Sequence, residues 1–409
     1  MTNMFEIHNN PPGDLWPKDV PRNIDIPEIP LDQMLRNAAE KFPDKIAITY
    51  FTSHFTYKKI NELVDRLATA LLKMGLKPNE TVALHFTNTP SCIVSFYAVV
   101  RAGGKVTLLS PLFKKLEITY QLRDSEARFY IHWDAFDQIN EGAIPDNVEK
   151  VIQSSVSPWF SSEPEKEELM DPSGNILYLE DILHNTEPDP TLLASVKVDL
   201  NEPCNLQYTG GTTGLPKGAM LTHRNLVSNA YQCRAWFPDA VEGGEVMLVA
   251  LPLYHIYAQT VAMHLSILIG ANMVMVSNPR DTDELLETIV HNKISIFPGV
   301  SALYNNLNNY QGIENHDLGS IKFCLCGAGA LPFEVQNTFE KMTGAVLREG
   351  YGLTEASPVS HAVPLSKYGK AKAGSVGFPF PNTECKIVDL ETGTKIVGIG
   401  EEGEICVKG

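Results

Sequence analysis

The feature that most constrains this chain is a repeated alternation of short apolar runs with longer amphipathic segments. The runs predict buried β-strands at residues 82–86, 106–109, 129–132, 246–251, 273–277, 295–297, 321–326 and 346–349. The intervening segments predict helices, among them 253–269, 282–292, 301–308 and 332–342. Strands that alternate with helices of this length are typical of parallel sheets covered on both faces. The sequence therefore predicts an α/β fold.

Changes in residue composition and pattern divide the 409 residues into four predicted regions. Residues 1–30 are rich in proline and polar groups and predict an extended arm. Residues 31–200 and 201–365 predict two α/β subdomains. In the first, a strand at 46–50 precedes Thr56, a predicted N-cap. Residues 366–409 carry glycines and prolines between short runs at 384–388 and 403–407, which predict an incomplete antiparallel β unit.

Composition excludes several classes of protein. The net charge of −16 argues against nucleic acid as a partner. The most apolar window, 246–276, is interrupted by Pro252, His255 and Gly270, so we expect no integral membrane span. The seven cysteines form no CxxC pair, which predicts neither a disulfide framework nor a zinc site. With no secretory signal at the N-terminus, this pattern predicts a cytoplasmic location.

The most informative segment is residues 208–218, which follow a predicted strand at 204–208 and precede a helix predicted to begin near Thr222. Its sequence is Tyr208-Thr209-Gly210-Gly211-Thr212-Thr213-Gly214-Leu215-Pro216-Lys217-Gly218. Glycines let backbone N–H groups approach an anion, threonines add hydroxyl donors, and Lys217 adds positive charge. The loop therefore predicts a polyphosphate cradle, distinct from a Walker A loop because Pro216 precedes the lysine. The alternative is a surface turn rich in small residues.

Three further motifs fall where predicted strands end. Residues 251–258 place His255 where it can orient a carboxylate or sense phosphate charge, although a core histidine is the alternative. Residues 326–332 contain Gly327, Ala328 and Gly329, which leave a flat slot, or serve only a tight turn. Residues 349–355 are Glu349-Gly350-Tyr351-Gly352-Leu353-Thr354-Glu355. They combine an aromatic face, a hydroxyl donor and a carboxylate suited to Mg²⁺.

Together these motifs resemble those of the adenylate-forming superfamily, which includes acyl-CoA synthetases, nonribosomal peptide synthetase adenylation domains and luciferases. The likeness runs from about Leu31 to the end and is greatest to medium- and long-chain fatty acid–CoA ligases. It implies two mainly parallel β-sheets flanked by helices in αβαβα layers, with the start of a small antiparallel β-barrel. It also implies that a fatty acid reacts with ATP to form an acyl-adenylate and is then transferred to coenzyme A.

The resemblance also implies roles for particular residues, with the nucleotide site in the second subdomain. Tyr351 would stack on adenine, Thr354 would contact the α-phosphate, and Glu355 would hold Mg²⁺. The residues implied in catalysis are Thr209, Lys217, His255, Thr354 and Glu355. Those implied in binding ATP or AMP are Thr209, Gly210, Gly211, Thr212, Thr213, Gly214, Lys217, Gly327, Ala328, Gly329, Glu349, Gly350, Tyr351, Gly352 and Thr354.

Other inferences concern completeness and substrate. The family's C-terminal domain would follow Gly409, so we expect a truncated chain with little activity alone. A non-catalytic nucleotide- or acyl-binding module is the alternative if the gene ends there. Val261, Met263, Leu265 and Ile267 would line an acyl tunnel or form core. Gln259 lies near the aromatic gate of some long-chain enzymes, which argues against a very long chain. An aryl–CoA ligase or amino-acid adenylation domain stays open, and the resemblance allows a homodimer.

Overall fold

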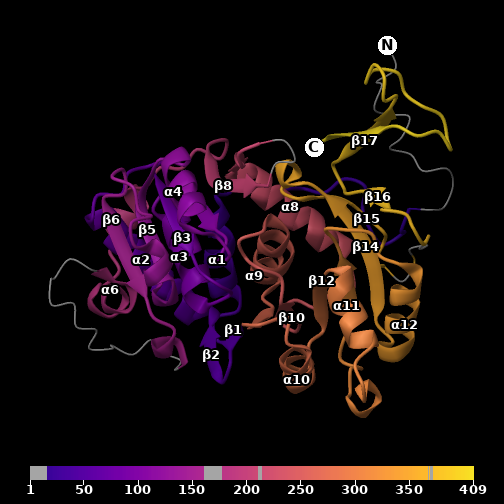
Figure 1. Ribbon diagram of the computed structural model, residues 1–409, viewed down its shortest axis with the longest axis horizontal. Coiled ribbons are helices and arrows are strands. Elements are labelled where there is room, and N and C mark those ends of the chain that lie inside the picture. The colour runs from indigo at the N-terminus through magenta and orange to yellow at the C-terminus, as the bar shows by residue number, and fades with distance from the viewer. Residues whose placement is uncertain (1–15, 161–176, 211–213, 367, 369–371) are drawn as a thin grey trace.

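The structure is a computed structural model that describes residues 16–160, 177–210, 214–366, 368 and 372–409. Within these residues two large sheets and one two-stranded sheet are present. Helices cover the large sheets, as Figure 1 shows. The α/β fold with two mainly parallel sheets is therefore confirmed, and the described residues form no closed barrel.

The first large sheet has seven strands in the order β7-β6-β5-β3-β4-β8-β9. Neighbours are parallel except at one edge, where β8 and β9 pair antiparallel. The strand bounds are β3 Thr81–His85, β4 Lys105–Leu109, β5 Ala127–Trp133, β6 Lys150–Ser154, β7 Leu177–Tyr178, β8 Pro203–Thr209 and β9 Lys217–Thr222. Because β8 runs parallel to β4, the end of β8 at Thr209 lies on the carboxyl edge of this sheet.

The second large sheet has nine strands in the order β16-β15-β14-β13-β12-β10-β11-β1-β2. Its central pairs are parallel, and its two edges are antiparallel. The strand bounds are β1 Ile46–Tyr50, β2 Ser53–Thr56, β10 Val246–Val249, β11 Asn272–Met275, β12 Ile296–Gly299, β13 Phe323–Cys326, β14 Val346–Gly352, β15 Val359–Ala362 and β16 Phe378–Pro379.

The two large sheets exchange strands across the subdomain limit predicted at residue 200. β1 and β2 come from the N-terminal region, yet β1 pairs with β11 in the nine-stranded sheet, with Ile48 opposite Met273. In return β8 and β9 join the seven-stranded sheet through β4. The limit at residue 200 stays a prediction, and the sheets themselves are assembled from both sides of it.

Helices pack in layers against these sheets. α1, α2, α3, α8 and α9 contact one another and form the layer between the sheets, whereas α11 and α12 lie on the far side of the nine-stranded sheet. The α-helix bounds are α1 Leu31–Lys41, α2 Tyr57–Lys73, α3 Pro90–Arg101, α4 Lys115–Asp124, α5 Asp137–Asn140, α6 Leu179–Asn185, α7 Pro190–Ser195, α8 His223–Trp236, α9 Leu265–Ile269, α10 Thr282–Asn292, α11 Ser301–Asn308 and α12 Phe333–Thr343.

The strand side chains alternate between two separate hydrophobic clusters. In β3, Val82 and Leu84 belong to the large central cluster, whereas Ala83 faces a smaller cluster that contains Ile118 of α4. This alternation follows from the period of two in a β-strand. Parallel sheets buried on both faces need apolar residues at nearly every strand position. This requirement explains the short apolar runs from which the strands were predicted.

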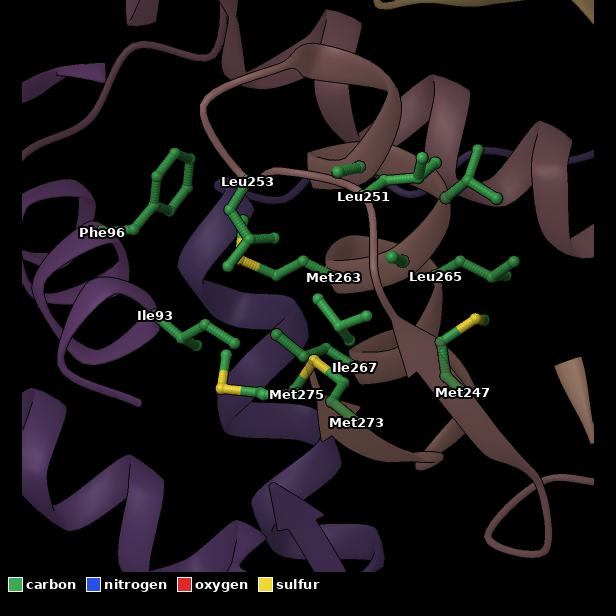
Figure 2. Packing of buried hydrophobic residues seen from close by; sticks show 14 of the residues in the cluster. Ile93, Phe96, Met247, Leu251, Leu253, Met263, Leu265, Ile267, Met273 and Met275 are labelled. Carbon is green, nitrogen blue, oxygen red and sulfur yellow. The ribbon is translucent and has the colours of Figure 1, made fainter. Parts of the chain in front are cut away.

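Figure 2 shows the central cluster where α3 approaches the helix that follows β10. Ile93 and Phe96 of α3 face side chains that include Met263 and Met275. The residues considered for an acyl tunnel all have exposed fractions of 1% or less and belong to this cluster; they are Val261, Met263, Leu265 and Ile267. These four side chains therefore belong to the hydrophobic core.

Two predicted helix starts are confirmed by their capping bonds. The Thr56 hydroxyl accepts a hydrogen bond from the Lys59 N–H at 3.2 Å. The Thr222 hydroxyl accepts one from the Asn225 N–H at 3.1 Å, so α8 begins where the sequence predicted. These bonds satisfy N–H groups that the first helical turn leaves without partners.

The helix predicted at 253–269 differs in its form. Residues 253–255 form a turn, a π-helical segment covers Ala258–His264, and α9 follows at Leu265–Ile269. Gly270 ends α9 in a left-handed conformation. Periodicity alone cannot separate the two helix types over so short a segment, and π-helical turns often mark functional sites.

Between the glycine-rich loop and α8 lies a strand that the sequence did not predict, β9 at Lys217–Thr222. β9 pairs antiparallel with β8, with Thr209 opposite Lys217. It is an edge strand, and five of its six residues are not fully buried. Its hydrophobic pattern is therefore too weak to identify a strand from sequence.

The two ends of the described chain lie together. Residues 16–30 contain no helix or strand. The Arg22 carbonyl accepts a hydrogen bond from the Asn382 N–H at 3.1 Å, and Trp16 packs edge-on against Trp236 of α8. β17 (Glu384–Val388) and β18 (Glu404–Lys408) pair antiparallel, in agreement with the predicted strand positions.

Two findings concern covalent links and membranes. All seven cysteines are free thiols. Within the described ranges, no helix combines the length and the apolar composition that crossing a bilayer requires.

Several buried histidines predict that the protein loses stability in acid. Burial lowers the pKa of His85 and His264 to about 3 and that of His223 and His361 to about 4. The unfolded chain therefore takes up protons below the ordinary pKa of about 6.5, while the folded chain does not. Stability is complete above that pH and falls below it by about 1.4 kcal/mol per pH unit for each such histidine.

Thermal melts from pH 7.5 to pH 5 test this expectation. We expect the melting temperature to fall with pH, and the His361→Gln variant to fall less steeply. His184 is exposed, so His184→Gln should keep the wild-type slope. A melting temperature that is constant over this range contradicts the prediction.

Candidate active site

A pocket opens at the carboxyl edge of the nine-stranded sheet. Its volume is about 360 Å³, and its walls come from the segments that follow β10 and β13 and from the end of β14. Ligands of open α/β sheets bind in this position, outside the carboxyl ends of the strands. Seven of the predicted site residues line it together: His255, Gly327, Ala328, Gly350, Tyr351, Gly352 and Thr354.

The floor of the pocket depends on close packing around Tyr257. The Tyr257 hydroxyl donates a hydrogen bond of 2.6 Å to the Leu325 carbonyl of β13. A Cβ atom on Gly327 would lie only 3.0 Å from the Tyr257 ring, and one on Gly350 would lie 3.2 Å from Leu325. Glycines therefore let the backbone of this slot approach its neighbours closely. Ala328 has a left-handed φ of 62°, a conformation that is uncommon outside glycine and clusters at functional sites.

The 349–355 motif forms the opposite wall. Tyr351 lies in β14, is 36% exposed and lines the pocket, so part of its side chain is available to a ligand. The Glu349 carboxylate accepts a hydrogen bond of 3.4 Å from the Leu331 N–H and so joins this strand to the turn after β13. Thr354 and Glu355 lie in a short 3-10 turn, η5 (Thr354–Ala356), where Glu355 is exposed. Glu349, Gly329 and Glu355 lie beside the pocket without lining it.

The glycine-rich loop joins β8 to β9 at the carboxyl edge of the other sheet. Gly211, Thr212 and Thr213 lie outside the described residues. Of the remaining predicted residues, Thr209 ends β8, Gly210 and Gly214 are exposed, and Lys217 begins β9 as an exposed side chain. β9 and η5 have Cα atoms within 8 Å of each other. The hairpin and the turn that carries Glu355 therefore lie side by side.

Two tyrosine hydroxyls join this hairpin to α4, that of Tyr120 from the helix and that of Tyr208 from β8, and sequence reasoning assigned neither a role. The Tyr120 hydroxyl donates to the Pro216 carbonyl at 2.8 Å. The Tyr208 hydroxyl donates to the Asp124 carboxylate at 2.6 Å, and its ring leaves only 3.1 Å for a Cβ on Gly218. Tyr120 carries no signal in the sequence, because a tyrosine on a half-exposed helix is ordinary. Tyr257 lies inside a quoted motif, but its hydrogen bond depends on a strand 68 residues away.

The charge state of His255 follows from its surroundings. The side chain is exposed by surface area, yet enough protein surrounds the ring for desolvation to lower its pKa below the ordinary value. The Tyr254 ring lies next to it, with centroids 4.5 Å apart. At pH 7 the imidazole is therefore neutral, so it offers one N–H donor and one acceptor nitrogen.

Glycine 352 provides a test of the pocket geometry. A Cβ at this position would lie 2.0 Å from the Pro358 carbonyl oxygen, a contact that the backbone cannot accept without moving. We expect Gly352→Ala to weaken binding of an acyl-adenylate analogue by about fivefold or more, because overpacking of this kind typically costs 1–3 kcal/mol and each 1.4 kcal/mol is tenfold in affinity. Isothermal titration calorimetry measures the change.

The matched control is Gly398→Ala. A Cβ at position 398 would meet its nearest atom at an ordinary contact distance of 3.5 Å. This variant should bind the analogue as the wild type does. Equal binding by Gly352→Ala and the wild type would show that the pocket does not depend on this close approach.

Comparison with known proteins identifies the family. Residues 35–409 match the family of AMP-binding enzymes. The long-chain-fatty-acid–CoA ligase of Bacillus subtilis (strain 168) is 37% identical over 407 residues, covering 96% of this chain and 71% of that protein. The chain therefore belongs to the family of AMP-binding enzymes.

Two solved structures share the fold. The anthranilate CoA ligase AuaEII in complex with anthranoyl-AMP superposes with a TM-score of 0.82 at 22% identity, over 95% of this chain and 70% of that one. The long-chain-fatty-acid–CoA ligase FadD1 from Archaeoglobus fulgidus superposes with a TM-score of 0.80 at 25% identity, over 95% and 76% respectively.

Proposed function

We propose that this chain carries the substrate- and nucleotide-binding domain of an AMP-forming fatty acid–CoA ligase. Its substrates are a carboxylic acid, ATP and coenzyme A. The family match supports the use of ATP, and the B. subtilis ligase supports a fatty acid as the acyl group. The observation that carries the proposal is the pocket of about 360 Å³, in which His255, the Gly327 turn and the Tyr351–Thr354 segment meet.

The reaction has two steps, and both require control of negative charge. A carboxylate oxygen attacks the α-phosphorus of ATP, the bond to pyrophosphate breaks, and an acyl-adenylate forms. The thiol of coenzyme A then attacks the acyl carbon, loses its proton, and AMP leaves. In the first step a carboxylate approaches a polyphosphate, so fixed donors and positive charge at the phosphates lower the barrier.

The residues divide between the two sides of the site. Lys217 and the hydroxyl of Thr209 lie on the hairpin, and Thr354 lies opposite on η5, where these groups would contact phosphate oxygens. The neutral His255 would donate a hydrogen bond to the substrate carboxylate or the phosphate next to it. Tyr351 would stack on adenine, with Gly327 to Gly329 beneath the ring.

Glu355 suits a magnesium ion. Its carboxylate is exposed on the turn next to the hairpin. In the described residues no group of three or more histidine, cysteine or acidic side chains forms a metal site. Magnesium bound to nucleotides commonly takes one or two protein carboxylates and completes its shell with phosphate oxygens and water. Glu355 would supply such a ligand, and the ion would neutralise phosphate charge.

An aryl–CoA ligase is the second candidate. The residues that would line a long acyl tunnel pack into the core, as Met263 and Ile267 do in Figure 2. A compact aromatic acid requires no such tunnel.

The location and the oligomeric state are separate questions. The seven free thiols support a cytoplasmic location. The homodimer stays a prediction that sedimentation can test.

Calorimetry with non-hydrolysable acyl-adenylate analogues distinguishes the substrates. We expect the octanoyl or palmitoyl sulfamoyl-adenosine to bind more tightly than the benzoyl compound, because each buried methylene contributes about 0.8 kcal/mol. Tightest binding of the benzoyl compound would favour the aryl ligase. Absence of binding by all three would contradict the proposed function.

Glu355→Gln tests the acidic ligand. Loss of one group that stabilises charge in a transition state commonly costs on the order of 10²–10³ in rate. In the full-length protein we expect slower pyrophosphate release, and we expect the Mg²⁺ concentration needed for half-maximal release to rise. AMP binding without metal should not change. Glu334→Gln is the control, because Glu334 is exposed at the start of α12; equal effects of both variants would contradict the assignment.

A further inference from the structure

Asn88 holds the chain that leads to His255. It lies between β3 and α3 and is 7% exposed. Its side-chain amide donates to the carbonyls of Val249 and Leu251, at 3.0 Å each. Its amide oxygen accepts from the Leu253 N–H at 3.0 Å. One side chain therefore satisfies three backbone groups between Val249, the last residue of β10, and Leu253.

Gln207 makes a second contact of the same kind. It lies in β8, two residues before Thr209, and is 3% exposed. Its Nε2 donates to the Tyr254 carbonyl at 2.7 Å. Its Oε1 accepts from Gln259 Nε2 at 2.7 Å, and Gln259 in turn accepts from Asn205 at 2.7 Å. Asn205 and Gln259 have exposed fractions of 0%.

These amides are needed because the held segment has little regular structure. Residues 250–255 belong to no strand or helix, and a turn hydrogen bond runs from the His255 N–H to the Pro252 carbonyl at 3.0 Å. Buried backbone polar groups require partners. Asparagine and glutamine can both donate and accept, which leucine of similar volume cannot.

The amides join the two halves of the site. Asn88 and Gln207 belong to the seven-stranded sheet and its loops, whereas the held segment leaves the nine-stranded sheet and ends at His255. We propose that Asn88 and Gln207 are positioning residues that fix His255 relative to the hairpin of Thr209 and Lys217. This inference rests on the proposed function, because it assigns His255 to the substrate carboxylate and the hairpin to phosphate.

The proposal predicts different effects on the use of the acid and on the use of ATP. Movement of His255 changes the orientation of the carboxylate, while Tyr351 lies in β14 and Gly327 follows β13. Tyr257, which packs against Gly327, is held by its own hydrogen bond to the Leu325 carbonyl. A displacement of about 1 Å at a reacting group can cost on the order of 10²-fold in rate. Loss of Asn88 should therefore lower kcat/KM for the acid much more than it raises KM for ATP.

The test uses Asn88→Ala and Gln207→Ala in the full-length protein, each also combined with His255→Ala. Pyrophosphate release is measured against acid and against ATP. We expect a fall in kcat/KM for the acid on the order of 10-fold to 10²-fold in the presence of His255. In the His255→Ala background the same substitutions should have little further effect, because residues that act through one another are not additive.

Asn147→Ala is the matched control. Asn147 also donates to two backbone carbonyls, those of Leu122 and Ala127 at 3.0 and 2.8 Å, but Ala127 begins β5 at the opposite edge of the sheet. This variant should lose melting temperature and keep the wild-type kcat/KM. Gln207→Ala keeps the test decisive if Asn88→Ala does not fold.

The outcomes separate the two proposals. If the wild-type protein releases no pyrophosphate with any acid, the proposed function fails. If the wild type is active but Asn88→Ala and Gln207→Ala act equally with and without His255, or no more strongly than Asn147→Ala, the positioning inference is overturned.

Discussion

The structure depends on one hydrophobic layer shared by two parallel sheets. Each sheet needs helices on both faces, because its strands are apolar on both sides. The layer of α1, α2, α3, α8 and α9 supplies an inner face to both, and one continuous cluster of buried residues runs through it. Burial on this scale fixes how the sheets sit against each other. The carboxyl edges that carry the hairpin and the pocket are consequently brought together, with β9 next to η5.

Polar contacts fix the detailed geometry of the site within the arrangement of sheets that the apolar layer determines. Hydrophobic packing is not directional, whereas a hydrogen bond fixes a distance and an angle. The buried amides of Asn88, Gln207 and Gln259 cross from one half to the other at the site, where exact placement matters for chemistry. Tyr120 and Tyr257 make hydrogen bonds within one half each, to the hairpin and to the pocket floor. These directional hydrogen bonds explain why buried polar side chains occur among the apolar residues of the interior.

Charge and shape are also divided within the site. The pocket wall is made of glycines and neutral groups, while the charged residues Lys217 and Glu355 are exposed on β9 and η5, which lie side by side. This arrangement suits a nucleotide, whose base is apolar and whose phosphates are charged. His255, whose pKa burial lowers, adds no positive charge to this wall at pH 7.

The sequence alone determined the fold class, most strands and helices, the caps at Thr56 and Thr222, and the motifs that meet in the pocket. Local periodicity and capping chemistry encode these features within a few residues. Only the tertiary structure decided that β1 pairs with β11, that β9 forms an edge strand, and that Asn88 and Tyr120 support the site. The residues that meet in these contacts can lie far apart in the sequence, as Ile48 and Met273 do. Their choice depends on how whole layers pack, which no local pattern records.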